Sequence, residues 1–126
     1  MKKNRSTTQH KTNLGKDGEK LAKEFAQKNG YAVLEMNWRW GKLEIDMICK
    51  KNNVLHFIEV KTRQSATFGH PEDFVDEQKM KRLFQIANQY MYLCKHQNEY
   101  CFDIISVTIK PNLTIRMIED AFFPTW

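Results

Sequence analysis

Residues 43–62 read LEIDMICKKNNVLHFIEVKT, two apolar runs on either side of a polar centre. Both runs are rich in the apolar and β-branched residues that favour strands. The Asn52-Asn53 pair between them tolerates the positive φ angles of a tight two-residue turn. The stretch therefore predicts a β-hairpin, and its charged residues need a reason to stand among so many apolar ones.

The register of this hairpin brings acidic side chains together. With Asn52 and Asn53 at the turn, Asp46 faces Glu59, and Lys61 faces Glu44. Side chains alternate along a strand, so the first two carboxylates oppose each other at roughly 5 Å with the lysine on the same face. Carboxylates held together in an apolar setting favour a hard divalent cation, Mg²⁺ or Mn²⁺.

A structural alternative stays open for these charges. Glu44 could pair with Lys61, while the two carboxylates reach solvent at a sheet edge. Apolar residues occupy both faces of the hairpin, which favours a covered sheet and hence the metal site. These residues are Ile45, Met47, Ile48, Leu55, Phe57, Ile58 and Val60.

The rest of the chain predicts one α/β domain over residues 14–126 with the element order αβββαββ. Helical periodicity starts at Leu14 and stops at Gly30, and a second amphipathic helix covers residues 80–94. Strand-like runs separated by turn residues fill the remaining stretches. They are residues 31–40, 42–50, 54–62, 101–109 and 113–118.

Glu19 on the first helix is a further candidate for the site. It lies beside a strip of small residues, Gly15, Ala22 and Ala26, that lets the helix backbone approach a sheet closely. Its carboxylate could then reach the strand carboxylates. The alternative is an ordinary solvated acid near the start of a helix, stabilised by the helix dipole.

Composition limits the class of protein. The chain has 126 residues, 41% of them hydrophobic, which suits one globular domain. It contains neither an apolar run long enough for a membrane span nor a secretory signal, so we expect a cytoplasmic protein without a membrane partner. Cys49, Cys94 and Cys101 lack metal-site spacing and predict reduced thiols rather than a zinc site.

Positive charge is concentrated at the N-terminus. Residues 1–13 contain four basic residues and no acid, which leaves 16 basic and 15 acidic residues in the remainder. This segment has little apolar surface and predicts a disordered tail that attracts phosphate backbones without regard to sequence. A merely solubilising tail is an equal alternative.

An acid on a first helix, followed by Asp and then Glu-x-Lys on successive strands, resembles the PD-(D/E)xK nuclease superfamily, which has the restriction-endonuclease-like fold and includes the Holliday-junction resolvases. The chain is more closely similar to the YraN-like family of small uncharacterised bacterial proteins. The segments that carry this resemblance are GEKLA at 18–22, GY at 30–31, NWR at 37–39, EIDMI at 44–48, FIEVKTR at 57–63, FGHP at 68–71 and FDII at 102–105.

The resemblance implies a mixed sheet of four or five strands flanked by helices, and an activity of phosphodiester hydrolysis. Asp46 and Glu59 would hold the divalent metal, and Lys61 would orient or activate the attacking water. Glu19 would help to position metal or water. Hydrolysis of this kind needs a Lewis acid and a water made nucleophilic at neutral pH.

Other residues are weaker candidates. Arg63, Lys79 and Arg82 could bind nucleic-acid phosphates, although a solvated basic face is the usual meaning of such clusters. Asp103 is as readily a structural acid as a member of a site. The aromatic residues at the C-terminus, including Phe123 and Trp126, could pack in the core, stack on bases or form a homodimer contact.

Two functions from different classes fit the sequence. One is a Mg²⁺-dependent endonuclease acting on structured or branched nucleic acid, with DNA the expected substrate although nothing in the sequence separates it from RNA. The other is a non-catalytic nucleic-acid-binding or scaffold protein that keeps the nuclease fold. Competent residue types at all four site positions favour the enzyme, whereas the nearly neutral folded part favours the binding protein.

Overall fold

The computed structural model describes residues 2–65 and 76–122, with side chains for residues 14–65 and 76–121. Its element order, αβββαββ, confirms the predicted order. The elements are α1 (Lys2–Lys28), β1 (Ala32–Trp40), β2 (Leu43–Lys51), β3 (Val54–Ser65), α2 (Glu77–Cys94), β4 (Tyr100–Lys110) and β5 (Thr114–Phe122).

The strands form one mixed sheet in the order β1-β2-β3-β4-β5. Neighbouring strands are antiparallel except β3 and β4, which pair in parallel. A parallel pair needs a crossover connection, and α2 lies within that connection. This five-stranded mixed sheet flanked by two helices is the arrangement of the restriction-endonuclease-like fold, as expected.

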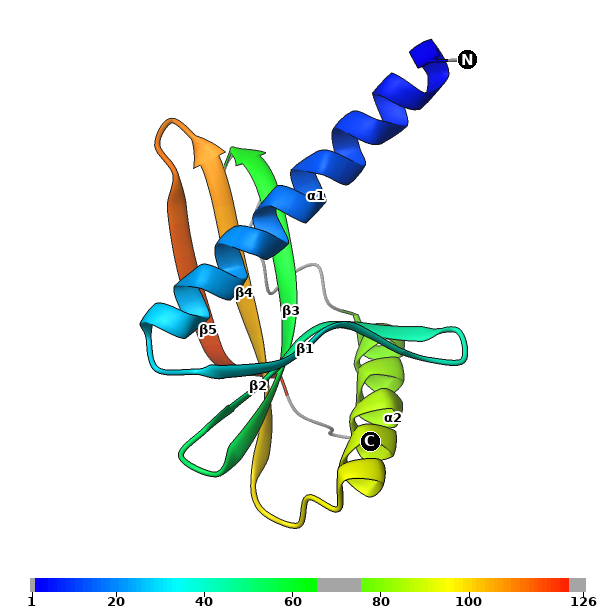
Figure 1. Cartoon of the computed structure of the whole chain (residues 1–126), viewed down its shortest axis with the longest axis vertical. Coiled ribbons are helices and arrows are strands. Elements are labelled where there is room, and N and C mark those ends of the chain that lie inside the picture. Colours follow the sequence, from blue (N-terminus) through cyan, green and yellow to red (C-terminus); the bar gives the residue numbers. More distant parts are fainter. Residues whose placement is uncertain (1, 66–75, 123–126) are drawn as a thin grey trace.

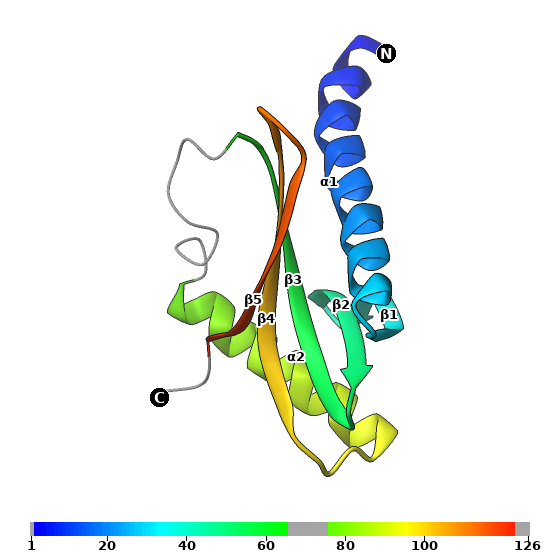
Figure 2. The same ribbon diagram turned by 90° about the vertical axis from the view of Figure 1, so that its left-hand side faces the viewer.

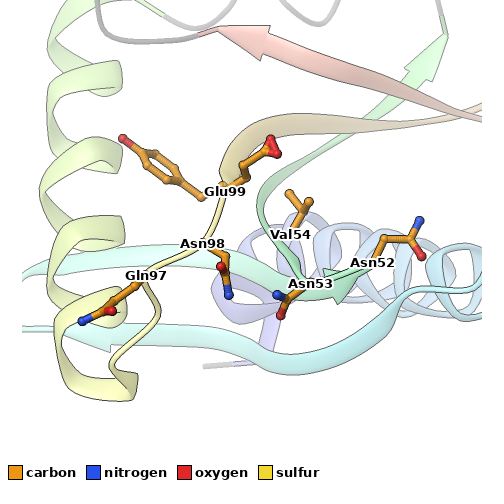
Figure 3. Close-up of a pocket in the computed structure, with 7 residues that line it drawn as sticks. Asn52, Asn53, Val54, Gln97, Asn98 and Glu99 are labelled. Carbon is orange, nitrogen blue, oxygen red and sulfur yellow. The ribbon is translucent and has the colours of Figure 1, made fainter.

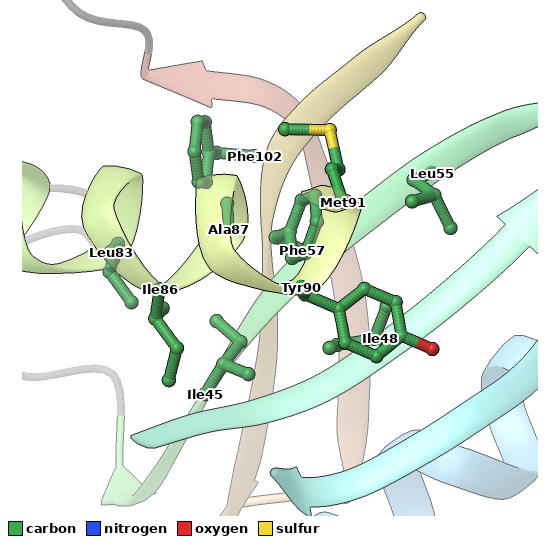
Figure 4. Close-up of a cluster of buried hydrophobic side chains, with 10 residues drawn as sticks. All are labelled: Ile45, Ile48, Leu55, Phe57, Leu83, Ile86, Ala87, Tyr90, Met91 and Phe102. Atoms are coloured by element: carbon green, nitrogen blue, oxygen red, sulfur yellow. The ribbon is translucent and has the colours of Figure 1, made fainter. Parts of the chain in front are cut away.

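The two helices cover opposite faces of the sheet (Figure 1), and Figure 2 shows the sheet edge-on between them. Each face has its own apolar core, which explains why the hairpin strands are apolar on both sides. The α2 face, drawn in Figure 4, buries Ile45, Ile48, Leu55, Phe57, Leu83, Ile86, Ala87, Tyr90, Met91 and Phe102. The α1 face buries Ala22, Ala26, Tyr31, Met47, Cys49, Ile58, Ile105 and Val107.

The β2–β3 hairpin has the predicted turn. Asn52 and Asn53 have φ angles of 51° and 66°, the left-handed conformation that a type I′ turn requires at both central residues. The predicted register holds over five residue pairs, from Lys51 opposite Val54 to Met47 opposite Ile58. The two asparagines of the turn therefore determine which residues of β2 and β3 lie opposite each other over these five pairs.

Beyond Met47 the hairpin differs from the prediction. Glu44 lies opposite Arg39 of β1, and their side chains form an exposed ion pair of 3.5 Å. The β2–β3 ladder ends at Met47 and Ile58, so the predicted pairs Asp46–Glu59 and Glu44–Lys61 are not part of it. The strand continues in register with β1 on its other side, and this pairing gives Glu44 its cationic neighbour.

Helix α2 starts at a defined cap. Asp76 has extended backbone angles, and its side chain accepts a hydrogen bond of 2.8 Å from the Lys79 backbone N–H. Such a cap satisfies one of the free donors in the first helical turn. It also fixes the turn from which the Lys79 side chain projects toward the sheet.

Helix α1 begins at Lys2, in the segment for which the sequence predicts a disordered tail. Extending an existing helix costs much less free energy than nucleating one, so polar residues can continue it outward. The domain boundary at residue 14 stays a prediction. Within the described ranges, neither helix is long and apolar enough to cross a membrane. The FGHP segment at 68–71 and the aromatic residues Phe123 and Trp126 lie outside the described residues.

Candidate functional site

The candidate site lies where β2 and β3 stop pairing with each other. There the Asp46 side chain accepts a hydrogen bond of 2.8 Å from the Val60 backbone N–H, with its Oδ2 atom as acceptor. This carboxylate thus bonds a β3 donor just beyond the last residue pair of the β2–β3 ladder. The bond holds Asp46 beside Glu59, the residue that precedes Val60.

Burial and mutual charge perturb the two carboxylates. Glu59 is only 6% exposed, and Asp46 is half-buried. Burial, followed by the charge of Glu59, raises the pKa of Asp46 to about 8, and the Val60 hydrogen bond opposes this shift only in part. Neighbouring carboxylates repel each other, and positive charge beside them offsets this repulsion.

Lys79 of α2 supplies one positive charge. Its Nζ atom forms an ion pair with Glu59 Oε2, and 30% of the lysine side chain is exposed. Burial lowers the pKa of Lys79, but the hydrogen bond and the charge of Glu59 outweigh it, so the pKa is raised overall. Sequence analysis proposed Lys79 as a phosphate contact. The structure instead brings its ammonium group directly onto the Glu59 carboxylate.

Lys61 belongs to the same cluster. It follows Glu59 by two residues on β3, so both side chains lie on the α2 face of the sheet. Burial and then the charge of Lys79 lower the pKa of the half-buried Lys61 ammonium, while Glu59 and Asp46 act in the opposite direction. A lysine with a lowered pKa can take part in proton transfer more readily than an exposed one.

Glu19 approaches from the other helix. Asn37 of β1 donates a hydrogen bond of 3.0 Å from Nδ2 to its Oε1 atom, and its charge contributes to the raised pKa of Asp46. The helix lies close to β3 at Gly18, where an added Cβ atom would stand 1.9 Å from Thr62 Oγ1. The predicted close approach of the helix to the sheet is confirmed, but the glycine at the point of contact is Gly18.

Gly15, which the sequence placed in the strip of small residues, has no such contact. A Cβ added there would meet no atom within 4 Å. Ala22 and Ala26, in contrast, are fully buried. The strip therefore runs through Gly18 rather than Gly15, because α1 extends past the strands toward its N-terminus (Figure 1).

Two further basic residues border the cluster. Arg63 is half-buried on β3, two residues after Lys61 and therefore on the same strand face. Arg82 is exposed on α2, about one turn after Lys79. Their role in nucleic-acid binding stays a prediction.

A second polar cluster was missed by the sequence analysis. His56, Cys101 and Asp103 meet on the α1 face of β3 and β4, with one nitrogen, sulfur or oxygen atom of each within 4.8 Å of the others. His56 is far from Cys101 and Asp103 along the chain, and the three residues lack a motif spacing. Only the parallel pairing of β3 with β4 could have revealed the cluster.

Comparison with known proteins agrees with the resemblance drawn from the sequence. The model of the uncharacterised protein family UPF0102 matches residues 18–107. The chain belongs to this family. A UPF0102 protein of Flavobacterium psychrophilum is 46% identical over 111 residues, which are 87% of this chain and 93% of the relative.

Other UPF0102 proteins are similar over nearly their whole length. One from Bacteroides thetaiotaomicron is 40% identical over 112 residues, 88% of this chain and 93% of the relative. One from Chloroherpeton thalassium is 39% identical over 114 residues, 87% of this chain and 88% of the relative. The family match covers every residue of both polar clusters. UPF0102 is uncharacterised, so the chemistry has to be argued from the site.

Proposed function

We propose that this protein is a divalent-metal-dependent nuclease that hydrolyses phosphodiester bonds. The observation that carries the proposal is the convergence of Asp46 and Glu59 with the ammonium groups of Lys61 and Lys79 where β2 and β3 separate. Buried carboxylates are costly unless they are paired or coordinate metal. Positive groups beside them suit an anionic substrate.

The residues fit Mg²⁺ or Mn²⁺. Carboxylate oxygens are the donors that both ions prefer. The ion pair between the Lys79 ammonium and Glu59 shows that this carboxylate accepts a positive charge beside it. Asp46 and Glu59 would hold the metal. When bound, it would supply Lewis-acid stabilisation of phosphoryl oxygens and a water of lowered pKa.

The protein's own residues have separate roles in this proposal. Lys61 orients the attacking water or moves its proton, since its lowered pKa and its position beside the carboxylates suit either task. Glu19, held by Asn37, helps to fix that water or the metal. Lys79 exchanges Glu59 for a substrate phosphate when metal is present, and Arg63 and Arg82 contact the neighbouring phosphates.

We propose structured or branched nucleic acid, DNA in the first instance, as the substrate, and the cytoplasm as the location. The helix-flanked sheet shares its arrangement with nucleases of this kind, and the basic residues 2–11 extend the reach of a small domain along a phosphate backbone. A homodimer would double the contact surface, which a branched substrate with two equivalent strands would use.

One observation favours a second function, a nucleic-acid-binding or scaffold protein without catalysis. The ion pair between Lys79 and Glu59 satisfies a buried carboxylate without metal. Beyond residue 13, acidic and basic residues nearly balance. The Lys79 ammonium can therefore neutralise Glu59 in a protein that neither binds metal nor catalyses a reaction.

A cleavage assay separates the two functions. Purified protein is incubated with single-stranded, duplex, flapped and four-way DNA, and with matched RNA, in Mg²⁺, Mn²⁺ or chelator. The nuclease predicts products from at least one substrate that depend on the metal and are lost in Asp46→Asn. Binding of the same substrates without any metal-dependent product would support the second function.

A further inference from the structure

His56, Cys101 and Asp103 lie on the two parallel strands at the centre of the sheet. His56 of β3 stands opposite Cys101 of β4, and Asp103 follows Cys101 by two residues on the same strand face. All three point to the α1 side of the sheet, away from Glu59 and Lys61. The cluster is therefore separate from the proposed nuclease site.

The ligand atoms of the cluster converge on one point. His56 Nδ1 is 2.6 Å from Asp103 Oδ2 and 3.0 Å from Cys101 Sγ, and the sulfur is 3.7 Å from that same oxygen. One imidazole nitrogen thus faces both an oxygen and a sulfur. One cation placed among the three atoms would contact each of them.

Neighbouring groups hold two of these side chains in place. Asp103 is fully buried, and its Oδ1 atom accepts a hydrogen bond of 2.9 Å from the Asp120 backbone N–H, which directs Oδ2 toward His56. The Tyr31 ring packs edge-on against the imidazole with 4.9 Å between ring centroids. Outer partners of this kind orient metal ligands and are typical of built metal sites.

The cluster opens to solvent on one side. His56 and Cys101 line a cavity of about 450 Å³ together with Glu119 and Asp120. Next to it lies a hollow of about 690 Å³ between the β2–β3 turn and residues 97–100 (Figure 3). Asn52, Val54 and Glu99 line both, so the two form one recess at this end of the sheet.

We propose that His56 Nδ1, Cys101 Sγ and Asp103 Oδ2 form a zinc site with three protein ligands and a fourth position open to this recess. Nitrogen, sulfur and carboxylate oxygen are the donors of protein zinc sites, and an open fourth position distinguishes exchangeable or catalytic zinc from closed structural sites. Mg²⁺ avoids sulfur and nitrogen donors, so the two clusters select different metals. Binding displaces the Cys101 thiol proton, which leaves to solvent as the zinc–sulfur bond forms.

Zinc titration of the full chain against a chromophoric chelator tests this site. The protein is kept metal-free and its thiols reduced. We expect about one zinc ion per chain, with affinity lowered more than about 100-fold in Cys101→Ala and in His56→Gln. Cys94→Ala is the matched control, because that thiol is exposed at the end of α2, on the helix that covers the opposite face of the sheet. It should bind zinc like the wild type.

Cobalt(II) gives a second readout that reports the thiolate ligand directly in the wild type. Cobalt bound to a thiolate shows charge-transfer absorption in the near ultraviolet, which the wild type and Cys94→Ala should show and Cys101→Ala should lack. Asp46→Asn should keep the signal, so failure here and failure of the nuclease proposal are distinguishable. No zinc binding by the wild type, or equal binding by Cys101→Ala, would mean that the cluster is a structural hydrogen-bond network.

Discussion

The carboxylate cluster around Glu59 and the imidazole–thiol cluster around His56 share strand β3 but differ in almost every physical respect. Glu59 lies on the α2 face, where only oxygen ligands and ammonium groups meet. His56 lies on the α1 face, where nitrogen, sulfur and oxygen meet. Residues three positions apart on one strand point to opposite faces, so a single strand serves two polar environments without mixing them.

The difference teaches that donor chemistry, rather than burial, separates the two clusters. Both contain a buried carboxylate, Glu59 or Asp103. In the first cluster that carboxylate is balanced by Lys79, a cation whose side chain is partly exposed. In the second it contacts an imidazole and accepts a hydrogen bond from a backbone N–H. The first suits a labile hard ion and an anionic substrate, and the second a firmly held borderline ion.

The largest expected effect is on cleavage, in Lys61→Ala. We expect the cleavage rate to fall more than about 100-fold, the lower end for losing a positioned proton-transfer or electrostatic group. Metal binding should persist, because an ammonium group is not a metal ligand. Rates are measured under single-turnover conditions, with melting followed in parallel.

Lys50→Ala is the control for this variant, since that lysine is exposed on β2. It should cleave like the wild type. Loss of stability in Lys61→Ala with an unchanged cleavage rate would make Lys61 a structural residue. The carboxylate cluster would then lack a proton-transfer group for the proposed reaction.

The next effect is on stability, in Lys79→Met. Removing the ammonium leaves the buried Glu59 carboxylate without its ion pair, which we expect to cost about 1 kcal/mol because the lysine is partly exposed to screening solvent. Mg²⁺ should restore the melting temperature and bind a few-fold more tightly than in the wild type, since Lys79 no longer competes for Glu59.

Thermal melts with and without Mg²⁺ measure this, with Lys81→Met as the control because it pairs with Glu77 at the surface. A melting temperature that falls equally with and without metal would show that Lys79 does not compete with metal for Glu59.

A smaller effect is the pH dependence of metal binding. Burial and the charge of Glu59 raise the pKa of Asp46 from 3.8 to about 8, so below this value a proton competes with the metal. Mn²⁺ affinity should rise with pH, by at most about tenfold per unit, and level off above about pH 8.

The raised pKa of Asp46 also affects the stability of the metal-free protein, which should fall rather than rise with pH. The unfolded chain releases the Asp46 proton at the lower pKa, so the free energy of unfolding should decrease as pH rises from 3.8 toward about 8. Asp46→Asn should remove this component of the pH dependence. A pH profile identical in wild type and variant would contradict the assignment to Asp46.

The smallest effect is on nucleic-acid affinity. Deleting residues 1–13 should weaken binding and flatten its salt dependence, by about 0.9 log units of slope for each phosphate of duplex DNA that the protein no longer neutralises. A full-length variant with glutamine at positions 2, 3, 5 and 11 should behave alike if charge is responsible. An unchanged slope in both would leave only the basic residues around the first cluster to bind phosphate.

The two clusters also differ in how far they could be predicted from sequence. The carboxylates stand in one hairpin whose register depends on a local turn, so Asn52 and Asn53 predicted the pairing as far as Met47 and Ile58, the neighbours of Asp46 and Glu59. The contact of Lys79 with Glu59 depends on how α2 packs on the sheet, which no local pattern reveals.

The second cluster depends on the parallel pairing of β3 with β4 across the α2 crossover. That pairing places His56 opposite Cys101, residues that showed no metal-ligand spacing. The predicted pairing of Glu44 with Lys61 was not found because β2 and β3 stop pairing after Met47 and Ile58, which the turn does not determine. Non-local pairing therefore limited both the fold and the site predictions.

The central claim, that Asp46 and Glu59 hold a divalent metal ion, is tested most directly by calorimetric titration of Mn²⁺. The account predicts one site in the wild type, weakened more than about 100-fold in Asp46→Asn and in Glu59→Gln. Glu44→Gln should bind like the wild type, since that carboxylate is exposed and paired with Arg39. Equal Mn²⁺ binding by all four proteins would contradict the account.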